Sequence, residues 1–401
     1  MNEPKLRFKA DDGSQFPDWE KKKLSDIFVE RREMQCIDDE YKLLSFTIEQ
    51  GVINPEDKKT NKRDFLMKDK ASKKFLRTEY NDIIYNPANL KYGAINRNKL
   101  GKGLLSPIYA IFYTEQNAVF MESIVRNPDF IKRTLKYLEG TVIKLMTLKP
   151  RDFLRMKSYI PCLEEQQKIA EFLSTIDTVI AKQKEIVSVW EERKKGVMQK
   201  LFRQEVRFKA DDGSEFPDWE EKKLGEVGDI VTGNTPSTKQ NDYYGECYLW
   251  VTPTDITDSR EVTSTAKMLT ELGYTVARHI PANSILVTCI ASIGKNAILR
   301  ENGSCNQQIN SITPYDEYSV EFVYYLICQN EKLLHENAGT GGMEILNKEN
   351  FSKIKMYFPC LAEQQKIADC LSSLDEVIEK QKATLSAWEE MKKGLLQQMF
   401  V

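Results

Sequence analysis

The chain has 401 residues, of which 41% are hydrophobic and 29% charged, and its formal net charge is −2. This length accommodates two or three ordinary domains, and the near-neutral charge excludes a uniformly basic nucleic-acid binder but not a local basic face. Because the longest apolar stretch, near 284–293, is too short to span a bilayer and the first residues lack an apolar signal core, we expect a cytoplasmic protein.

The first segment of the chain is spelled twice. Residues 8–20 read FKADDGSQFPDWE, and residues 208–220 repeat these letters with a single change, Gln15 to Glu215. The duplication returns at 161–202 and 359–400, where 26 of 42 aligned positions are identical. The intervening segments, 25–159 and 225–357, differ widely, so the sequence predicts a duplicated frame that holds two diverged inserts.

Both inserts combine strand-like and helical patterns in chain order. Runs rich in Ile, Tyr, Val and Thr predict strands, and apolar periodicity near 3.6 predicts helices. The expected strands are 81–85, 108–113, 248–252 and 284–291, and the expected helices are 128–138 and 321–336. Each insert is therefore expected to be mixed α/β.

The repeated segments that end each copy predict two long helices. Apolar residues recur at alternating steps of four and three along both segments, as in a coiled-coil seam. The seam positions are Ile169, Leu173, Ile176, Ile180, Gln183, Val187, Trp190, Lys194, Val197 and Leu201, with equivalents from Ile367 to Met399. Two interpretations are open: the helices pair with each other, which we favour, or each packs on its own domain.

The layout of the copies indicates an antiparallel pair. The first helix leads into the second copy, and an antiparallel second helix would bring residue 400 back beside residue 5. The predicted architecture is a pseudo-twofold α/β fold with two domains joined by two long helices. Its expected boundaries are 1–159 for the first domain, 160–204 for the first helix, 205–357 for the second domain and 358–401 for the second helix.

Motifs for catalysis are incomplete. PDWEEK at 217–222 lacks the separated acids of a nuclease, SIGKNA at 292–297 lacks the first Gly and the Ser/Thr of a phosphate loop, and NPAN at 86–89 departs from the NPPY-type motif of adenine methyltransferases. With two histidines and no CxxC pair, no metal site is expected.

Polar and basic loops suggest contacts with DNA. Lys and Arg neutralise phosphates, and Asn, Gln, Ser and Arg can read base edges. The run 58–77 holds nine Lys and Arg against two Asp, but charged runs are often only solvated surface. Loops in both inserts yield the candidate DNA-binding residues Lys91, Tyr92, Asn96, Arg97, Lys99, Thr235, Ser237, Asp255, Ser292, Lys295, Asn296 and Gln307.

The whole chain resembles the specificity subunits of type I restriction–modification enzymes. The twin EQQKIA motifs at 165–170 and 363–368 carry the resemblance, and TGNTPS at 232–237, WVTPTDI at 250–256 and ASIGKNAIL at 291–299 are similar to target-recognition domains of that family. The resemblance implies two target-recognition domains that each read one half of a split DNA target.

The resemblance also implies partners. Two methyltransferase (M) subunits and the restriction (R) subunits would assemble on this chain and carry S-adenosylmethionine, ATP and Mg²⁺, while the chain itself would hold no cofactor and catalyse no reaction. Two other hypotheses remain: a coiled-coil scaffold that binds only protein, and a nuclease or methyltransferase in its own right. Sequence-dependent DNA binding separates the first hypothesis from the scaffold, and activity without partners would support the enzyme.

Overall fold

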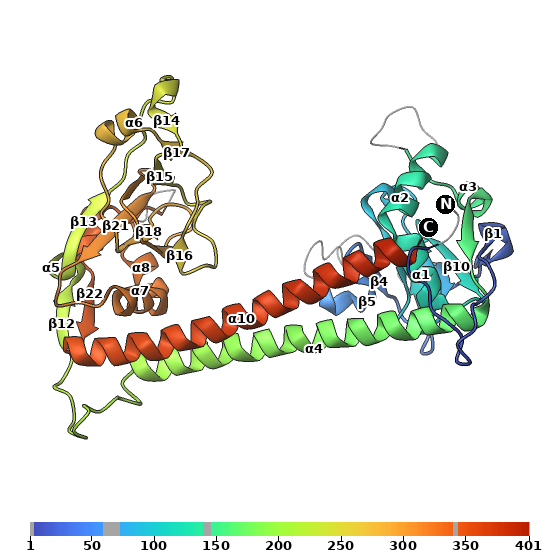
Figure 1. Ribbon diagram of the computed structural model, residues 1–401, viewed down its shortest axis with the longest axis horizontal. Coiled ribbons are helices and arrows are strands. Elements are labelled where there is room, and N and C mark those ends of the chain that lie inside the picture. The colour runs from blue at the N-terminus through green and yellow to red at the C-terminus, as the bar shows by residue number, and fades with distance from the viewer. Residues whose placement is uncertain (1–3, 59–72, 139–145, 340–343, 401) are drawn as a thin grey trace. The chain divides into compact units, whose positions relative to one another are not determined.

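The computed structural model describes residues 4–58, 73–138, 146–339 and 344–400. The chain divides into two compact units (Figure 1). Unit 1 comprises Met1–Lys184 and Ala383–Val401, and unit 2 comprises Glu185–Lys382. Each unit contains one insert, one copy of the repeated opening segment, and part of each long helix.

The core of unit 1 is a four-stranded antiparallel sheet in the order β2-β10-β7-β8. Its strands are β2 (Phe28–Glu30), β10 (Ala110–Thr114), β7 (Ile83–Tyr85) and β8 (Ile95–Arg97). Smaller sheets add β3 (Met34–Gln35), β6 (Phe75–Thr78) and β9 (Gly103–Leu105), and the pair β4 (Ser45–Thr47) and β5 (Gly51–Ile53). The helices of this insert are α1 (Ala118–Arg126), α2 (Pro128–Thr134) and α3 (Pro150–Arg155).

The core of unit 2 is a five-stranded sheet in the order β13-β21-β18-β19-β16. Its strands are β13 (Gly228–Thr232), β21 (Ile309–Pro314), β18 (Ser284–Thr288), β19 (Asn296–Leu299) and β16 (Glu261–Val262). A second sheet contains β14 (Tyr244–Gly245), β17 (Met268–Leu269), β15 (Tyr248–Val251) and β20 (Gly303–Cys305). The helices are α5 (Leu224–Val227), α6 (Glu271–Val276), α7 (Val320–Gln329), α8 (Glu331–Glu336) and α9 (Lys348–Lys353).

The two inserts share a sheet that their sequences do not reveal. In unit 1, Ile83 pairs with Phe112 and Arg97, and in unit 2 the equivalent Ile285 pairs with Ile312 and Ile298. Four strands therefore follow the same order and register in both units. Conservation of the sheet with different side chains means that only the pattern of burial, rather than the residues themselves, is needed to form it.

The predicted long helices are confirmed as α4 (Leu163–Phe202) and α10 (Leu361–Met399). Every predicted seam position is buried or half-buried on both helices. In unit 1, Lys184 forms an ion pair of 2.8 Å with Glu389, and Lys392 pairs with Asp177. Because the residue number rises along α4 as it falls along α10, the two helices run antiparallel in this unit.

Unit 2 repeats the same ion pairs with the helices exchanged. Lys382 lies 2.9 Å from Glu191, and Lys194 lies 2.5 Å from Asp375. Each pair corresponds to one in unit 1 at an offset of 198 residues, as expected of an internal twofold duplication. The mixed α/β inserts and the antiparallel helix pair predicted from the sequence are thus both confirmed.

The helices also pack on the inserts. In unit 1, Ile169 and Leu173 of α4 and Met399 of α10 belong to the same buried cluster as the sheet residues Ile83 and Phe112. In unit 2, the equivalent residues of the exchanged helices join the cluster around Ile285 and Ile312. The two interpretations of the seam are therefore complementary: these helices pair with each other and also pack on the domains.

The repeated opening segment anchors each insert to its helix. Glu165 of α4 is fully buried and accepts hydrogen bonds from Arg7 (2.8 Å) and from the Trp19 indole (3.2 Å). Glu363 of α10 accepts the same bonds from Arg207 (2.7 Å) and Trp219 (3.2 Å). A buried carboxylate requires such partners, which explains why the segment recurs.

A short strand continues each opening segment and pairs with the strand before the helix. β1 (Glu20–Lys23) pairs with β11 (Lys157–Ile160), and β12 (Glu220–Lys223) pairs with β22 (Lys355–Phe358), both antiparallel and in the same register. Each two-stranded ribbon therefore joins the start of its insert to the residues that precede the long helix.

The two ends of the chain lie together, as predicted. The Leu6 N–H donates to the Gln398 carbonyl at 3.1 Å, and the Phe400 ring packs against Trp19 at 6.4 Å between centroids. At the unbroken junction of unit 2, Val206 N–H and the Lys200 carbonyl make the equivalent contact at 3.4 Å. In unit 2 this contact lies at a continuous turn between the end of α4 and the second opening segment. In unit 1 the same contact joins two segments that no peptide bond links directly.

Candidate nucleic-acid interface

Four loops of unit 2 meet at one end of its sheets. They are 233–240 after β13, 252–255 after β15, 289–295 between β18 and β19, and 306–308 between β20 and β21. Backbone hydrogen bonds of 2.8–3.1 Å connect them: Gly233 N–H to Ile309, Asn306 N–H to Val251, and Cys289 N–H to Gln308. These loops contain the second-insert candidates, apart from Asn296, which begins β19. The fold thus gathers candidate residues that lie up to 72 positions apart in the sequence.

Gly233 allows the first of these loops to lie directly on the last. A Cβ atom at this position would be 2.1 Å from the Cys305 carbonyl oxygen and 2.4 Å from that of Asn306, closer than atoms can approach. The glycine in TGNTPS is therefore required by backbone contact. Beyond it, the Thr235 hydroxyl donates to Gln307 Oε1 at 2.6 Å, which joins two candidate residues at the surface.

The candidates of unit 2 divide by exposure into surface residues and supporting residues. Thr235, Ser237, Lys295 and Gln307 are exposed, and Ser292 is half-buried. Asp255 is half-buried, and its carboxylate accepts bonds from Thr252 N–H (2.8 Å) and Ala266 N–H (2.9 Å). The exposed residues have side chains available to a ligand, whereas Asp255 holds the loop that follows β15.

Asn296 is buried beneath the hairpin that carries Lys295. Its amide donates to the Gly294 carbonyl at 3.1 Å, and the Thr288 hydroxyl donates to the Lys295 carbonyl at 3.1 Å. Ala291 and Gly294 adopt positive φ angles of 64° and 93°, which close the hairpin tightly. These contacts fix the backbone at Lys295 while its ammonium group points to solvent.

Arg278 is a residue of this surface that the sequence did not indicate. Its N–H donates to Asn234 Oδ1 and its guanidinium donates to the Thr232 carbonyl, both at 2.6 Å. The next residue, His279, stacks on Tyr274 with ring centroids 4.1 Å apart. Arg278 lies outside the Gly-containing loops from which the candidates were drawn, so no local signal marks it, and only its contact with TGNTPS places it here.

Unit 1 carries Lys91 and Tyr92 in the equivalent hairpin. Asn86 N–H donates to the Ala94 carbonyl at 3.0 Å. This bond matches the one from the Thr288 backbone N–H to the Lys295 carbonyl, at 2.8 Å, in unit 2. The Lys91 ammonium lies 5.2 Å from the centre of the Tyr92 ring, and Tyr92 is 64% exposed. The candidate loops of the two inserts have little sequence in common, but they occupy equivalent positions in the two units.

The remaining candidates of unit 1 lie toward the other end of β8. Asn96 is buried and donates to the Ile48 carbonyl at 3.0 Å. Arg97 is half-buried and bonds to Glu122 Oε2 at 3.0 Å, and the exposed Lys99 lies 3.3 Å from Glu122 Oε1. Of the first-insert candidates, Lys91 and Tyr92 therefore lie in the hairpin, Arg97 and Lys99 lie beside α1, and Asn96 is buried against the segment between β4 and β5.

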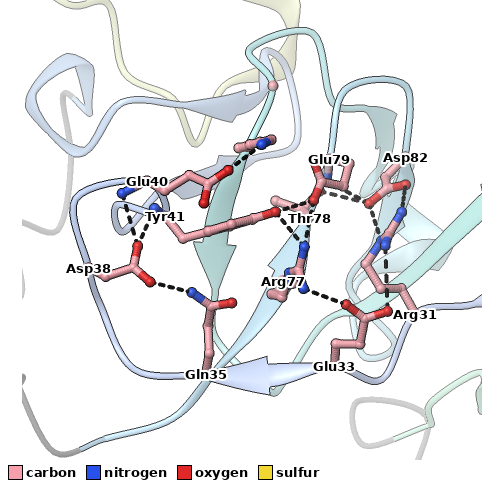
Figure 2. A network of polar contacts seen from close by, with 12 residues as sticks. Arg31, Glu33, Gln35, Asp38, Glu40, Tyr41, Arg77, Thr78, Glu79 and Asp82 are labelled. Atoms are coloured by element: carbon pink, nitrogen blue, oxygen red, sulfur yellow. Dashed lines mark hydrogen bonds and ion pairs between the residues drawn. The ribbon is translucent and has the colours of Figure 1, made fainter.

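The loop that follows β2 in unit 1, equivalent to TGNTPS, is held by the polar network in Figure 2. Arg77 bonds to Glu33 at 2.9 Å and to Glu79 at 3.0 Å, and the Tyr41 hydroxyl bonds to both Arg77 and Glu79. Arg31 and the buried Asp82 pair at 2.8 Å, and burial raises the pKa of the Asp82 carboxyl although Arg31 opposes this. In unit 1, ion pairs therefore hold the loop that follows β2. In unit 2, the close backbone contact at Gly233 holds the equivalent loop.

Three other features of the sequence concern the basic run, metal binding and membrane spans. Residues 59–72, the centre of the basic run, lie outside the described residues. Within the described ranges, no group of three His, Cys, Asp or Glu is arranged to hold a metal ion. Nor does any helix in this part of the chain have the length and apolarity needed to cross a bilayer.

The second copy matches a known protein family. Residues 217–387 match the family model described as the type I restriction modification DNA specificity domain. This match assigns residues 217–387 to the DNA specificity domains of type I restriction modification systems, and the curated relatives below are specificity subunits of type I restriction enzymes.

Two curated relatives support the assignment. The type I restriction enzyme MjaIX specificity subunit of Methanocaldococcus jannaschii is 32% identical over 210 residues, covering 50% of this chain and 48% of the relative. The HindI specificity subunit of Haemophilus influenzae is 38% identical over 146 residues, covering 35% of this chain and 32% of the relative. The matches span about half and a third of these relatives' lengths.

A solved structure shares the fold. The S subunit of a type I restriction–modification system from M. genitalium superposes with a TM-score of 0.58 at 14% identity, covering 100% of this chain and 99% of the other. At this identity the similarity concerns the fold alone.

Proposed function

We propose that this chain is the DNA-recognition subunit of a type I restriction–modification complex. Each unit reads one half of a split double-stranded target through the loops at the end of its sheet. The observation that carries the proposal is the equivalence of the two hairpins, 86–94 and 288–295, which present Lys91 and Tyr92 in one unit and Lys295 in the other.

The division between frame and insert supports this function. The frame repeats the same buried anchors in both units, whereas the inserts keep a sheet and vary the loops. A protein that reads two different half-sites for two identical partners needs these properties. Loops on a rigid scaffold can change contacts to bases without changing the fold.

The chemistry of modification and cleavage is assigned to other subunits. We propose that the chain catalyses no reaction, and that two methyltransferase (M) subunits bind S-adenosylmethionine and methylate adenine at N6. Restriction (R) subunits supply the ATP- and Mg²⁺-dependent deoxyribonuclease. The complex acts on cellular DNA, and we therefore propose a cytoplasmic location.

An exchange of inserts tests the proposal. The methylation target of the reconstituted complex is mapped for the wild type and for a chimera in which 225–357 come from another such subunit. One half of the target should change, and the other half should remain. A frame variant, Asp211→Ala, serves as the control and should leave both halves unchanged.

Two results would contradict the proposal. An unchanged target in an active chimera would show that the insert does not choose sequence. Assembly with partners but without any sequence-dependent DNA binding would favour the protein scaffold instead.

A further inference from the structure

Three cations in unit 1 share one buried carboxylate. Glu122 of α1 lies 3.0 Å from Arg97 Nε, 3.3 Å from Lys99 Nζ and 3.4 Å from Arg126 NH1. Burial opposes ionisation of Glu122, but the three cations hold the pKa of its carboxyl below the usual value. The carboxylate neutralises one charge and orients all three side chains, so the cluster keeps an excess of two positive charges at neutral pH.

The cluster opens onto a groove. A groove of about 690 Å³ lies between α1 and the helix pair of unit 1, and all three cations line it. Lys99 and Arg126 keep 54% and 41% of their side chains exposed. The opposite wall includes Lys392, which is paired with Asp177. Glu49 also lines the groove, and the three cations still outnumber the carboxylates of Glu49 and Glu122, so an excess of positive charge faces solvent.

The equivalent strand and helix positions of unit 2 do not form such a cluster around one carboxylate. By strand register, Lys99 corresponds to Arg300, which pairs with Glu261 at 2.9 Å and with Glu321 at 2.8 Å. The buried ring of Tyr325 stands where unit 1 has Ser123, and its hydroxyl donates to Asp375 at 2.6 Å. Among the described residues, a cluster of three cations around one buried carboxylate is thus a feature of unit 1, and it is not a consequence of the shared frame.

We propose that Arg97, Lys99 and Arg126 form a phosphate-binding site that grips the DNA backbone beside the first half-site. The inference rests on the proposed function and assigns these residues to sequence-independent contact rather than to base reading. Guanidinium and ammonium groups offer donors and no acceptor, which suits phosphodiester oxygens.

The position of the cluster fits a duplex held by the hairpin. β8 joins the hairpin to the cluster and contains only Ile95–Arg97, about 7 Å at 3.3 Å per residue. One turn of DNA extends about 34 Å. Tyr92 and Lys99 are seven residues apart, at most about 23 Å of chain at 3.3 Å per residue, so one turn of a duplex in contact with Tyr92 is long enough to reach Lys99.

The salt dependence of DNA binding tests the site. Binding of the assembled complex to its target and to an unrelated duplex is measured between 50 and 200 mM salt for wild type and the double variant Lys99→Gln/Arg126→Gln. Loss of two phosphate contacts should lower the slope of log K against log salt by about 2. Affinity for both duplexes should fall by the same factor, about 10-fold or more at 0.1 M salt, and the methylated sequence should not change.

A matched variant controls for net charge. Arg300→Gln/Lys332→Gln removes an equal number of positive charges, two, from unit 2. This variant should leave the slope unchanged. Equal slopes for the wild type and the Lys99→Gln/Arg126→Gln variant would overturn the site.

Two further outcomes are distinct. Impaired assembly with the methyltransferase subunits, with DNA binding intact, would assign the cluster to an acidic protein and overturn the proposal. If the wild-type complex shows no sequence preference at all, the proposed function fails, independently of this site.

Discussion

The two units build one architecture from different amounts of shared sequence. Their anchors use the same residues in the same contacts: Arg7, Trp19 and Glu165 in unit 1, and Arg207, Trp219 and Glu363 in unit 2. Their sheets use different residues in the same register. Contacts that hold buried charge tolerate few alternatives, whereas a sheet core accepts many apolar sets of similar volume.

The units also differ where an insert meets the helix pair. In unit 2, Tyr325 and Arg260 fill this position, and Arg260 donates to Ser372 of α10 at 2.8 Å. In unit 1, Ser123 leaves a groove lined by cations. The frame therefore fixes how an insert is attached, but the surface beside the attachment is free to vary.

The largest expected effect tests the shared anchors. Arg7→Ala and Arg207→Ala each leave a buried glutamate without its cation, and we expect each to lower the free energy of unfolding by about 3–5 kcal/mol. Urea unfolding with a probe in each unit measures both. Equal losses support equivalence of the anchors.

A surface ion pair of the same segment provides the control. Lys168 pairs with the exposed Asp11 at 2.5 Å, and Lys168→Ala should cost about 0–1 kcal/mol. If only one of the two arginine variants has a lower free energy of unfolding, the two anchors are not equivalent.

A second prediction concerns the residue that fills the groove of unit 2. Tyr325→Ser gives this unit the side chain of unit 1 and removes a buried ring, which should cost about 3–4 kcal/mol. Ser123→Ala is the matched change in unit 1 and should stay within about 0.5 kcal/mol. Thermal unfolding of the two variants checks the difference, and similar values would show that Tyr325 does not support unit 2.

A third prediction uses the pH dependence of unit 1. Glu122→Gln removes charge-assisted bonds and should cost about 2 kcal/mol at pH 7. The pKa of Glu122 is lowered in the folded protein from the ordinary value of 4.5, so its contribution is complete above that value and is lost as pH falls below it. The difference between wild type and variant should therefore shrink below about pH 4.5. A difference that does not decrease at all as the pH falls below this value would show that the ion cluster is not its origin.

The smallest expected effect concerns the ends of the chain. Joining the two termini and opening the exposed junction at 203–205 transfers the covalent link from unit 2 to unit 1. Because the Leu6–Gln398 contact already matches the Val206–Lys200 contact, stability should change by less than about 1 kcal/mol. Methylation by the reconstituted complex is the functional check, and a permuted protein that fails to fold would show that the two corners are not equivalent.

Much of the architecture could be predicted because its signals are local or repeated. The seam from Ile169 to Leu201 has the period of a helix, and the copy beginning at Ile367 repeats it, so α4 and α10 were expected. The hairpin loops were expected from Gly, Lys and Asn in short polar segments. In contrast, α1 was not predicted, although its buried face includes Phe120 and Met121.

The contacts of the candidate residues could not be predicted. Asn96 and Asn296 look like polar loop residues in the sequence, but tertiary packing buries both. Arg278 joins the TGNTPS loop through contacts 44 and 46 residues away. Glu122 gathers Arg97 and Lys99 only because α1 lies against β8.

By itself, the sequence determined the duplicated frame, the paired helices and the mixed α/β character of the inserts, because repetition and hydrophobic period act over a few turns of chain. Tertiary structure alone decided that two unlike inserts share one sheet, which candidate side chains face solvent, and that three cations of unit 1 gather around one buried carboxylate. These properties depend on strand register and on contacts between distant segments, and a shift of one residue in register would send each side chain to the opposite face.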